Sequence, residues 1–273
     1  MPVHLSNSKD TPTVSIITPT WNREEFLPFA YHSFCAQQDV SIEWIVIDDS
    51  NKPSAFISTL NDPRVTYLHL SSRKTIGEKR NIAIELSRGE IIAHFDDDEI
   101  YGPNYISTML EHMRLQEADF AKLSAFFLYS TIHHAFAYWD LMHTSGLHFR
   151  WDEGPMTVLS FPANSKRFAD NYLGFGFSYI YTKRLWASQP FEPVSFNEDG
   201  IFAAAARARG VRLALPADEM GLCLHVVHNS NTSVSFPQSI LPERLVKRHL
   251  SYFCETLGKT FPRGSAAILE PHK

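Results

Sequence analysis

Short apolar runs alternate with amphipathic segments along the first hundred residues of the chain. Four runs rich in β-branched residues have the length of strands, at residues 14–17, 43–47, 65–70 and 90–95. The segments between them, at residues 24–37, 53–60 and 76–87, are predicted as helices. Strands alternating with helices predict an α/β fold with a mostly parallel central sheet and helices on both faces.

Polar residues follow three of these runs at the point where each strand is expected to end. They occupy residues 18–22, 48–50 and 96–99. In parallel sheets, ligands bind beyond the carboxyl ends of the strands. We therefore expect the three polar segments to converge on one edge of the sheet.

The last of these segments, Asp96-Asp97-Asp98-Glu99, has two interpretations. Packed carboxylates repel one another, and a divalent cation with oxygen ligands is a common way to offset the repulsion. Alternatively, the run is a solvated turn that caps a helix beginning near Pro103. Convergence with two other polar strand ends favours the cation.

Composition narrows the class of protein. The chain of 273 residues is long enough for one α/β domain with a packed core, and we expect a single compact unit. The net charge of -5 gives no electrostatic basis for binding nucleic acid. Three widely separated cysteines and a polar N-terminal segment favour a cytoplasmic protein, and no stretch is apolar enough to cross a membrane.

Four segments together resemble a known family. They are VSIITPTWNRE (14–24), EWIVIDDS (43–50), GEKRNIAIELSRGEIIAHFDDDE (77–99) and FNEDGIF (196–202). From about Val14 to His228, the chain resembles the inverting family 2 glycosyltransferases, which have the GT-A fold. The resemblance implies a single GT-A (Rossmann-like) domain with a C-terminal helical extension.

The same resemblance implies a division of the chain. Residues 14–100 correspond to the nucleotide-sugar-binding half of the domain and residues 101–235 to the acceptor-binding half. Residues 1–13 form an N-terminal tail, and residues 236–273 form the C-terminal extension, with a helix predicted at 243–257.

Donor-binding residues follow from the family motifs. Pro19 and Trp21 match positions that line the base pocket, where the indole would stack on the base. Asp49 matches the carboxylate that accepts a hydrogen bond from the base, which favours a uridine or thymidine donor. Arg80 matches the arginine beside the diphosphate.

Metal-binding residues follow in the same way. The DxD-type run implies that Asp98 ligates Mn²⁺ or Mg²⁺ directly, while Asp96 or Asp97 contacts the ribose or the ion through water. Related enzymes place a histidine from the region of His225 and His228 near the metal. Residues three apart on a strand face opposite sides, so His225 and His228 are not expected to act as a pair. His228 is the better candidate because it borders a polar loop.

Glu198 and Asp199 match the catalytic acidic pair of the family. Asp199 would be the base that removes the acceptor proton, and Glu198 would orient the acceptor or the base. The pair also precedes an alanine-rich helix at residues 201–209, whose N-terminus it could cap. Both roles are compatible.

Two further segments belong to the predicted acceptor half. Residues 172–179 resemble the small-residue strand that forms the floor of the sugar and acceptor site, where Gly174 and Gly176 permit close approach of a sugar ring or mark a bulge. Residues 126–151 are rich in aromatic residues and histidines, which suit either a core or an acceptor platform.

The function implied by the resemblance is metal-dependent transfer of a sugar from a nucleoside diphosphate sugar, UDP-sugar favoured, to a saccharide, peptide or small-molecule acceptor. A single displacement would invert the anomeric configuration. Two other classes stay open: a nucleotidyltransferase-type nucleotide-sugar enzyme, and an inactive nucleotide-sugar-binding protein. A homo-oligomer is also left open.

Overall fold

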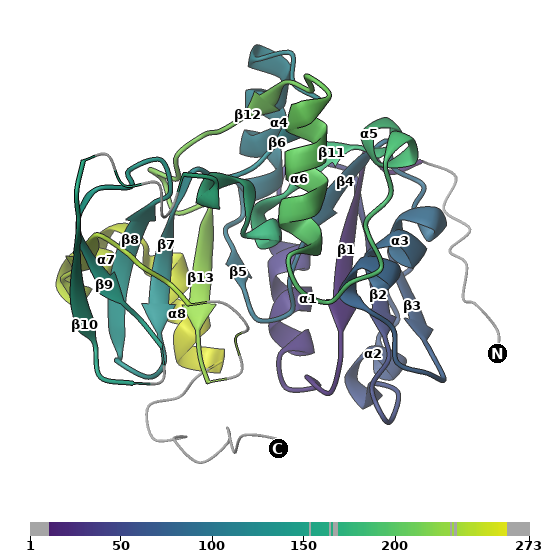
Figure 1. Cartoon of the computed structure of the whole chain (residues 1–273). Coiled ribbons are helices and arrows are strands. Elements are labelled where there is room, and N and C mark those ends of the chain that lie inside the picture. The colour runs from purple at the N-terminus through teal and green to yellow at the C-terminus, as the bar shows by residue number, and fades with distance from the viewer. Residues whose placement is uncertain are drawn as a thin grey trace. The chain divides into compact units, whose positions relative to one another are not determined.

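The computed structural model of the protein describes residues 11–152, 154–163, 165, 169–229, 231 and 234–260. Most of the predicted N-terminal tail (1–10) and the end of the C-terminal extension (261–273) lie outside this part. Contacts group the chain into two compact units, where we expected one; Figure 1 shows their elements. Unit 1 comprises Met1–Asp98, Pro103–Lys122 and Leu173–Pro216, and unit 2 comprises Glu99–Gly102, Leu123–Tyr172 and Ala217–Lys273. The predicted functional halves at residue 100 are a different partition and stay a prediction.

Unit 1 is built on a seven-stranded sheet with the order β12, β6, β11, β4, β1, β2, β3. Its strands are β1 (Val14–Thr20), β2 (Ile42–Asp48), β3 (Val65–His69), β4 (Ile91–His94), β6 (Phe120–Ala121), β11 (Ile180–Thr182) and β12 (Leu213–Ala214). β1 pairs in parallel with β2 and β4, and β2 with β3, while β11 runs antiparallel to β4 and β6. The predicted α/β class with a mostly parallel sheet is confirmed.

Helices lie on both faces of this sheet. They are α1 (Leu27–Ala36), α2 (Ala55–Thr59), α3 (Ile76–Leu86), α4 (Tyr105–Leu115), α5 (Lys183–Ser188) and α6 (Glu198–Ala208). Phe34 of α1 stacks on Trp44 of β2, with 5.8 Å between ring centroids. Glu43 precedes Trp44 and so points to the opposite face, where its carboxylate accepts a 2.7 Å hydrogen bond from Arg88, just after α3.

The start of α3 is fixed by a capping box. The Thr75 hydroxyl accepts the Glu78 N–H at 3.2 Å, and the Glu78 carboxylate accepts the Thr75 N–H at 2.8 Å. These two bonds satisfy backbone donors that a helix start leaves unpaired. The capping box therefore places Lys79 and Arg80 in the first turns of α3, beside the strand ends.

The start of α6 depends on a left-handed residue. Asn197 has φ of 62°, and Glu198 and Asp199 follow in the first turn of the helix. A side chain at Gly200 would meet the Asn197 amide, since a Cβ there would lie 2.2 Å from Asn197 Oδ1. This tight turn directs the acidic pair away from the helix axis at its positive end.

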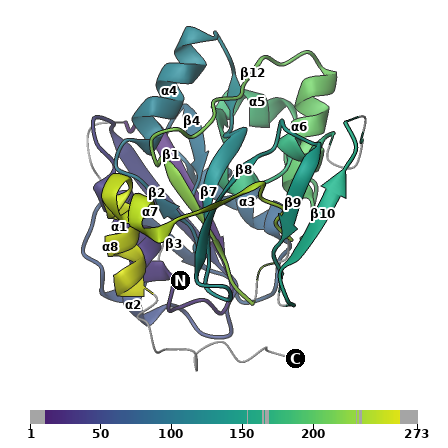
Figure 2. The same ribbon diagram turned by 90° about the vertical axis from the view of Figure 1, so that its left-hand side faces the viewer.

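Unit 2 contains a five-stranded sheet of order β14, β8, β7, β13, β5 and a β9–β10 hairpin (Figure 2). Its strands are β5 (Ile100–Tyr101), β7 (Ala125–Ser130), β8 (Ala135–Asp140), β9 (Gly146–Arg150), β10 (Thr157–Phe161), β13 (Cys223–Val227) and β14 (Ser239–Leu241). Within the aromatic-rich segment, Trp139, His148 and Trp151 are fully buried. These three side chains belong to a core.

Two expectations about local structure are wrong in detail. The C-terminal helix consists of α7 (Glu243–His249) and α8 (Ser251–Thr260), because Leu250 leaves the helical conformation with ψ of 47°. Residues 172–179 do not form a strand. They contain part of a 3₁₀ turn at Asn171–Leu173 and another at Gly176–Ser178, and the strand begins at Ile180.

No helix in the described part of the chain combines the length and the apolar character that a membrane span requires.

Candidate active site

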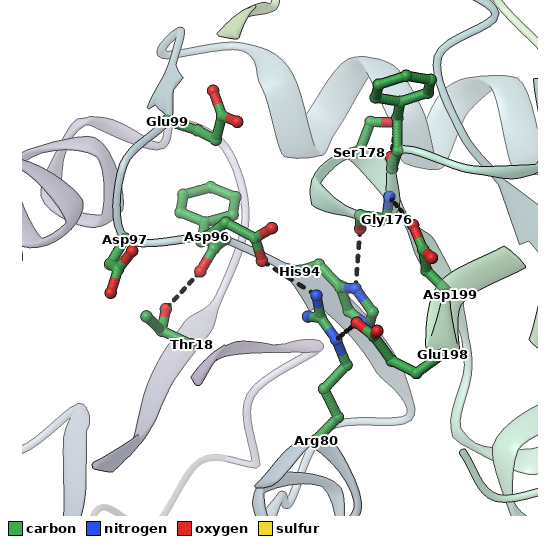
Figure 3. Close-up of polar contacts among 12 residues, drawn as sticks. Thr18, Arg80, His94, Asp96, Asp97, Glu99, Gly176, Ser178, Glu198 and Asp199 are labelled. Atoms are coloured by element: carbon green, nitrogen blue, oxygen red, sulfur yellow. Dashed lines mark hydrogen bonds and ion pairs between the residues drawn. The ribbon is translucent and has the colours of Figure 1, made fainter. Parts of the chain in front are cut away.

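The polar strand ends of unit 1 converge as predicted. Thr18 in β1 donates a 2.7 Å hydrogen bond to the Phe95 carbonyl oxygen, just after β4 (Figure 3). The Thr18 hydroxyl also accepts the Trp44 indole N–H from β2 at 2.8 Å. The buried hydroxyl therefore links β1 to β2 on one side and to the end of β4 on the other.

Two of the aspartates after β4 are paired with an arginine that follows β1. Arg23 Nη1 lies 2.9 Å from Asp97 Oδ1 and 2.5 Å from Asp98 Oδ2. Asp97 also accepts a 2.6 Å hydrogen bond from the Thr20 hydroxyl. Asp98 in particular raises the pKa of Arg23, so the guanidinium stays charged and offsets the repulsion between the two carboxylates.

The same aspartates fit a hard divalent cation in chemistry, since their donors are all carboxylate oxygens. Within the described ranges, no three His, Cys, Asp or Glu side chains form a group already arranged to hold a metal ion. Arg23 occupies oxygens of Asp97 and Asp98, and a cation would compete with it for them. Asp96 is the most accessible of the three, with 31% of its side chain exposed.

Asp49 is buried beneath basic residues at the end of β2. Its side chain has 0% exposure, and its carboxylate binds Arg73 Nη1 at 2.9 Å, Lys79 Nζ at 2.8 Å and the Lys74 N–H at 2.7 Å. The Arg73 guanidinium lies 3.9 Å from the centre of the Trp21 ring. A base at this position would therefore meet Trp21 and Arg73 before it reached Asp49.

Of the other two predicted base-pocket residues, Trp21 is 40% exposed and Pro19 is a half-buried residue of β1. One indole face carries the Arg73 guanidinium, and a base would stack on the other. Both roles stay predictions.

Arg80 joins the acidic run to the acidic pair of α6. Its Nη2 lies 3.2 Å from Asp96 Oδ1, and its Nε lies 3.3 Å from Glu198 Oε1 (Figure 3). The third nitrogen, Nη1, is buried and has no hydrogen-bond partner among the described residues. A buried donor without a partner is costly, so Nη1 is the atom best prepared to meet an anionic ligand.

Asp199 is held by backbone donors rather than by a cation. Its Oδ2 accepts the Gly176 N–H at 2.6 Å, and its Oδ1 accepts the Gly200 N–H at 2.7 Å (Figure 3). Gly176 must lack a side chain, because a Cβ there would lie 2.6 Å from the Asp199 Cβ. The close approach at Gly176 is thus made by Asp199, whereas the expected approach of a sugar ring stays a prediction.

Burial sets the protonation tendencies of the site. Desolvation raises the pKa values of Asp96, Asp97 and Glu198, while Arg80 and Arg23 counteract it. Like charges add to the effect, since Asp98 and Asp199 raise the pKa of Asp96 further. An incoming cation or hydrogen-bond donor would favour the charged forms.

The remaining sequence candidates lie in unit 2. His225 Nδ1 is 2.5 Å from the Glu99 carboxylate, which also accepts the Val226 N–H at 2.8 Å. Glu99 thus contacts β13, and the N-cap residue of α4 is Asn104 instead of the acidic run first considered. His228 is a buried residue just after β13, and its role as a metal ligand stays a prediction.

Several charged residues of the site were not singled out from the sequence. Arg23, Arg73 and Lys79 pair with the predicted aspartates, and Lys122 is a fully buried lysine just after β6. Arg23 and Lys79 lie within the family-like segments, so their position beside the motif residues was the available signal. Arg73 and Lys122 lie outside any motif and could be found only in the folded chain.

Comparisons with known proteins show the family of the chain. The sequence model described as Glycosyl transferase family 2 matches residues 15–171. A relative from Escherichia coli (strain K12), the putative colanic acid biosynthesis glycosyl transferase WcaA, is 37% identical over 108 residues, which cover 38% of this chain and 39% of that protein. The chain therefore matches well under half the length of this relative.

Solved structures show the same fold. S. aureus TarS 1–349 in complex with UDP-GlcNAc aligns with a TM-score of 0.60 at 15% identity, covering 90% of this chain and 73% of that chain. The mannosyltransferase PcManGT from Pyrobaculum calidifontis, in complex with GDP-Man and Mn²⁺, aligns with a TM-score of 0.57 at 15% identity, covering 82% and 59%. At this identity the likeness shows the fold alone.

Proposed function

Because the chain belongs to glycosyltransferase family 2, we propose that it transfers a sugar from a nucleoside diphosphate sugar to a nucleophile of an acceptor by single displacement with inversion. One observation carries the proposal: Arg80 joins Asp96 at the donor side to Glu198 beside the candidate base, and its buried Nη1 has no hydrogen-bond partner among the described residues. Such a guanidinium suits a diphosphate oxygen placed between the two acidic groups.

On the donor side, the leaving group is a diphosphate on which negative charge builds as the glycosidic bond breaks. Arg80 Nη1 would donate a hydrogen bond to it. Mn²⁺ or Mg²⁺, held by Asp98 and Asp96, would stabilise the developing charge as a Lewis acid. Asp97, held by Thr20 and Arg23, would orient the ribose or a water.

On the acceptor side, Asp199 would remove the proton of the attacking hydroxyl. The two backbone N–H groups that bind its oxygens fix the direction of the carboxylate. Glu198, paired with Arg80, would orient the acceptor. Attack from the face opposite the leaving diphosphate inverts the anomeric centre. The acceptor is proposed as a saccharide, peptide or small molecule.

We propose a UDP-sugar as the donor. Asp49 supplies a carboxylate acceptor suited to the uracil imide N–H, although Arg73 and Lys79 now bind it. The UDP-GlcNAc complex of TarS supports this choice, while the GDP-Man complex of PcManGT makes guanosine the alternative to test.

Replacing Asp98 with Asn tests the metal and donor assignments together. We expect UDP with Mn²⁺ to raise the melting temperature of the wild-type protein, since saturation at 100 times Kd contributes about 2.7 kcal/mol. UDP with EDTA should give a much smaller rise. The Asp98→Asn variant should lose the metal-dependent part, and calorimetric titration with UDP and Mn²⁺ measures the loss.

The matched control is Glu111→Gln, which removes an exposed carboxylate that pairs with Arg114 on α4, away from these residues. A wild-type UDP response in the Asp98 variant would refute the metal assignment. A response to GDP in place of UDP would refute the uridine preference, and no response to any nucleoside diphosphate would refute donor binding.

Turnover is tested by UDP release from UDP-glucose, UDP-galactose and UDP-N-acetylglucosamine, with and without saccharide acceptors. Release that depends on an acceptor supports transfer. Binding of UDP without release from any of these sugars would favour the inactive nucleotide-sugar-binding alternative.

A further inference from the structure

Gly176 connects the candidate base to a buried histidine of β4. The N–H of Gly176 donates to Asp199 Oδ2 at 2.6 Å, and its carbonyl oxygen lies 2.8 Å from His94 Nδ1 (Figure 3). Phe175, the residue before it, has a left-handed backbone with φ of 63°. The segment that contacts Asp199 is thus a left-handed turn at Phe175. Both the N–H and the carbonyl oxygen of the following Gly176 are hydrogen-bonded to side chains.

The tautomer of His94 follows from these partners. A carbonyl oxygen only accepts hydrogen bonds, so Nδ1 carries the proton and donates to Gly176. Nε2 lies 2.9 Å from the Tyr181 hydroxyl. Burial raises the pKa of Tyr181 well above its ordinary value, so this hydroxyl keeps its proton and donates to Nε2.

Burial also determines the charge of His94. The side chain is fully buried, and desolvation, with a contribution from Arg80, holds the pKa of the imidazole well below 6.5. The ring is therefore neutral throughout the physiological range. Tyr179, Tyr181 and Phe191 surround it, with ring centroids 5.5, 5.4 and 5.6 Å away. Packing leaves the imidazole one orientation.

We infer that His94 is a positioning residue for the transfer reaction: its Nδ1–H holds the Gly176 turn so that the Gly176 N–H fixes the carboxylate of Asp199. The inference rests on the proposed function, since it assumes that Asp199 is the base. His94 touches neither donor nor acceptor in this scheme and acts only through Gly176. The hydrogen bond from Gly176 fixes the direction of the Asp199 carboxylate, so a loosened turn lets the carboxylate rotate away from the acceptor proton.

Three substitutions in the full chain separate the donor role from packing. His94→Phe keeps a ring and removes the donor. His94→Asn places an amide nitrogen near the position of Nδ1, whereas His94→Gln places one near the position of Nε2. Because Asn and Gln are both amides, they form a matched pair that differs in where the donor lies.

Two measurements follow the effect. The chemical shift of the Gly176 amide proton in the NMR spectrum reports its hydrogen bond to Asp199 without requiring turnover. Release of UDP from UDP-glucose, or from the panel sugar that turns over, gives kcat. All three variants keep the other titratable groups that interact electrostatically with Asp199, namely Arg80, Asp96, Lys122, Tyr179 and Glu198.

In His94→Phe, the Gly176 amide proton signal should move upfield as its hydrogen bond to Asp199 lengthens, and kcat should fall by up to about 100-fold with UDP affinity unchanged. His94→Asn should restore most of kcat and the wild-type amide shift, and His94→Gln should not.

A wild-type Gly176 amide shift and a wild-type kcat in His94→Phe would overturn the inference. If that variant does not fold, equal behaviour of the Asn and Gln variants would overturn it instead. Failure of the proposed function looks different: Asp199→Asn would then retain transfer, whatever the His94 variants do.

Discussion

Asp199→Asn is expected to reduce kcat by about 100- to 10,000-fold, the usual contribution of a positioned general base. An amide cannot accept the acceptor proton, and its NH₂ group would also face a backbone N–H of Gly176 or Gly200 where an oxygen now accepts. UDP affinity should stay within about twofold of wild type, because donor contacts are assigned to other residues. Steady-state UDP release and calorimetric titration with UDP measure the two quantities.

Glu111→Gln on α4 again serves as the control for loss of one carboxylate. Melting temperatures of both variants show whether reduced turnover reflects unfolding. If Asp199→Asn keeps more than about a tenth of the wild-type kcat, Asp199 is not the base, and Glu198 becomes the next residue to test.

Lys122→Met is expected to raise the stability of the protein at pH 7. Lys122 follows β6, is 0% exposed, and its Nζ has no hydrogen-bond partner in the described residues. Burial lowers the pKa of Lys122 from 10.5 to about 7, with Asp199 acting in the opposite direction. A shift of this size corresponds to a penalty on the order of 5 kcal/mol for keeping the ammonium buried.

The pH dependence of this penalty has a definite sign. Between about pH 7 and 10.5, the unfolded chain keeps the proton on Lys122 while the folded chain has released it. The unfolded state therefore binds more protons, and the unfolding free energy of the wild-type protein rises with pH across this window. The advantage of Lys122→Met should be greatest below about pH 7 and shrink toward pH 10.5.

Melting temperatures of both proteins between pH 6 and 10 measure this difference. Lys52→Met, at an exposed lysine between β2 and α2, should show no comparable change with pH. If the difference in melting temperature between wild type and Lys122→Met does not change with pH, Lys122 is charged, and therefore partnered, across the whole pH range.

The buried positions of unit 1 explain why so much of its architecture could be predicted. β-branched runs such as Ile16-Ile17 and Ile45–Ile47 are buried in strands, as expected of a parallel sheet covered on both faces. Thr75 and Glu78 cap α3 through bonds between near neighbours, which local spacing encodes. The conformation of residues 172–179 could not be predicted, because the left-handed turn at Phe175 and the hydrogen bonds of Gly176 depend on contacts with side chains distant in sequence.

The candidate site likewise has features that the sequence predicts and features that only the tertiary structure determines. The acidic character of residues 96–99 and of Glu198-Asp199, and the convergence of the strand ends, follow from residue type and the order of strands and helices. Which basic side chain pairs with which carboxylate depends on the complete fold. Arg80 and Glu198, for example, are 118 positions apart in the sequence and come into contact only in the folded chain. Electrostatic pairing acts over a few ångströms in space, and a pattern of neighbours along the chain does not encode it.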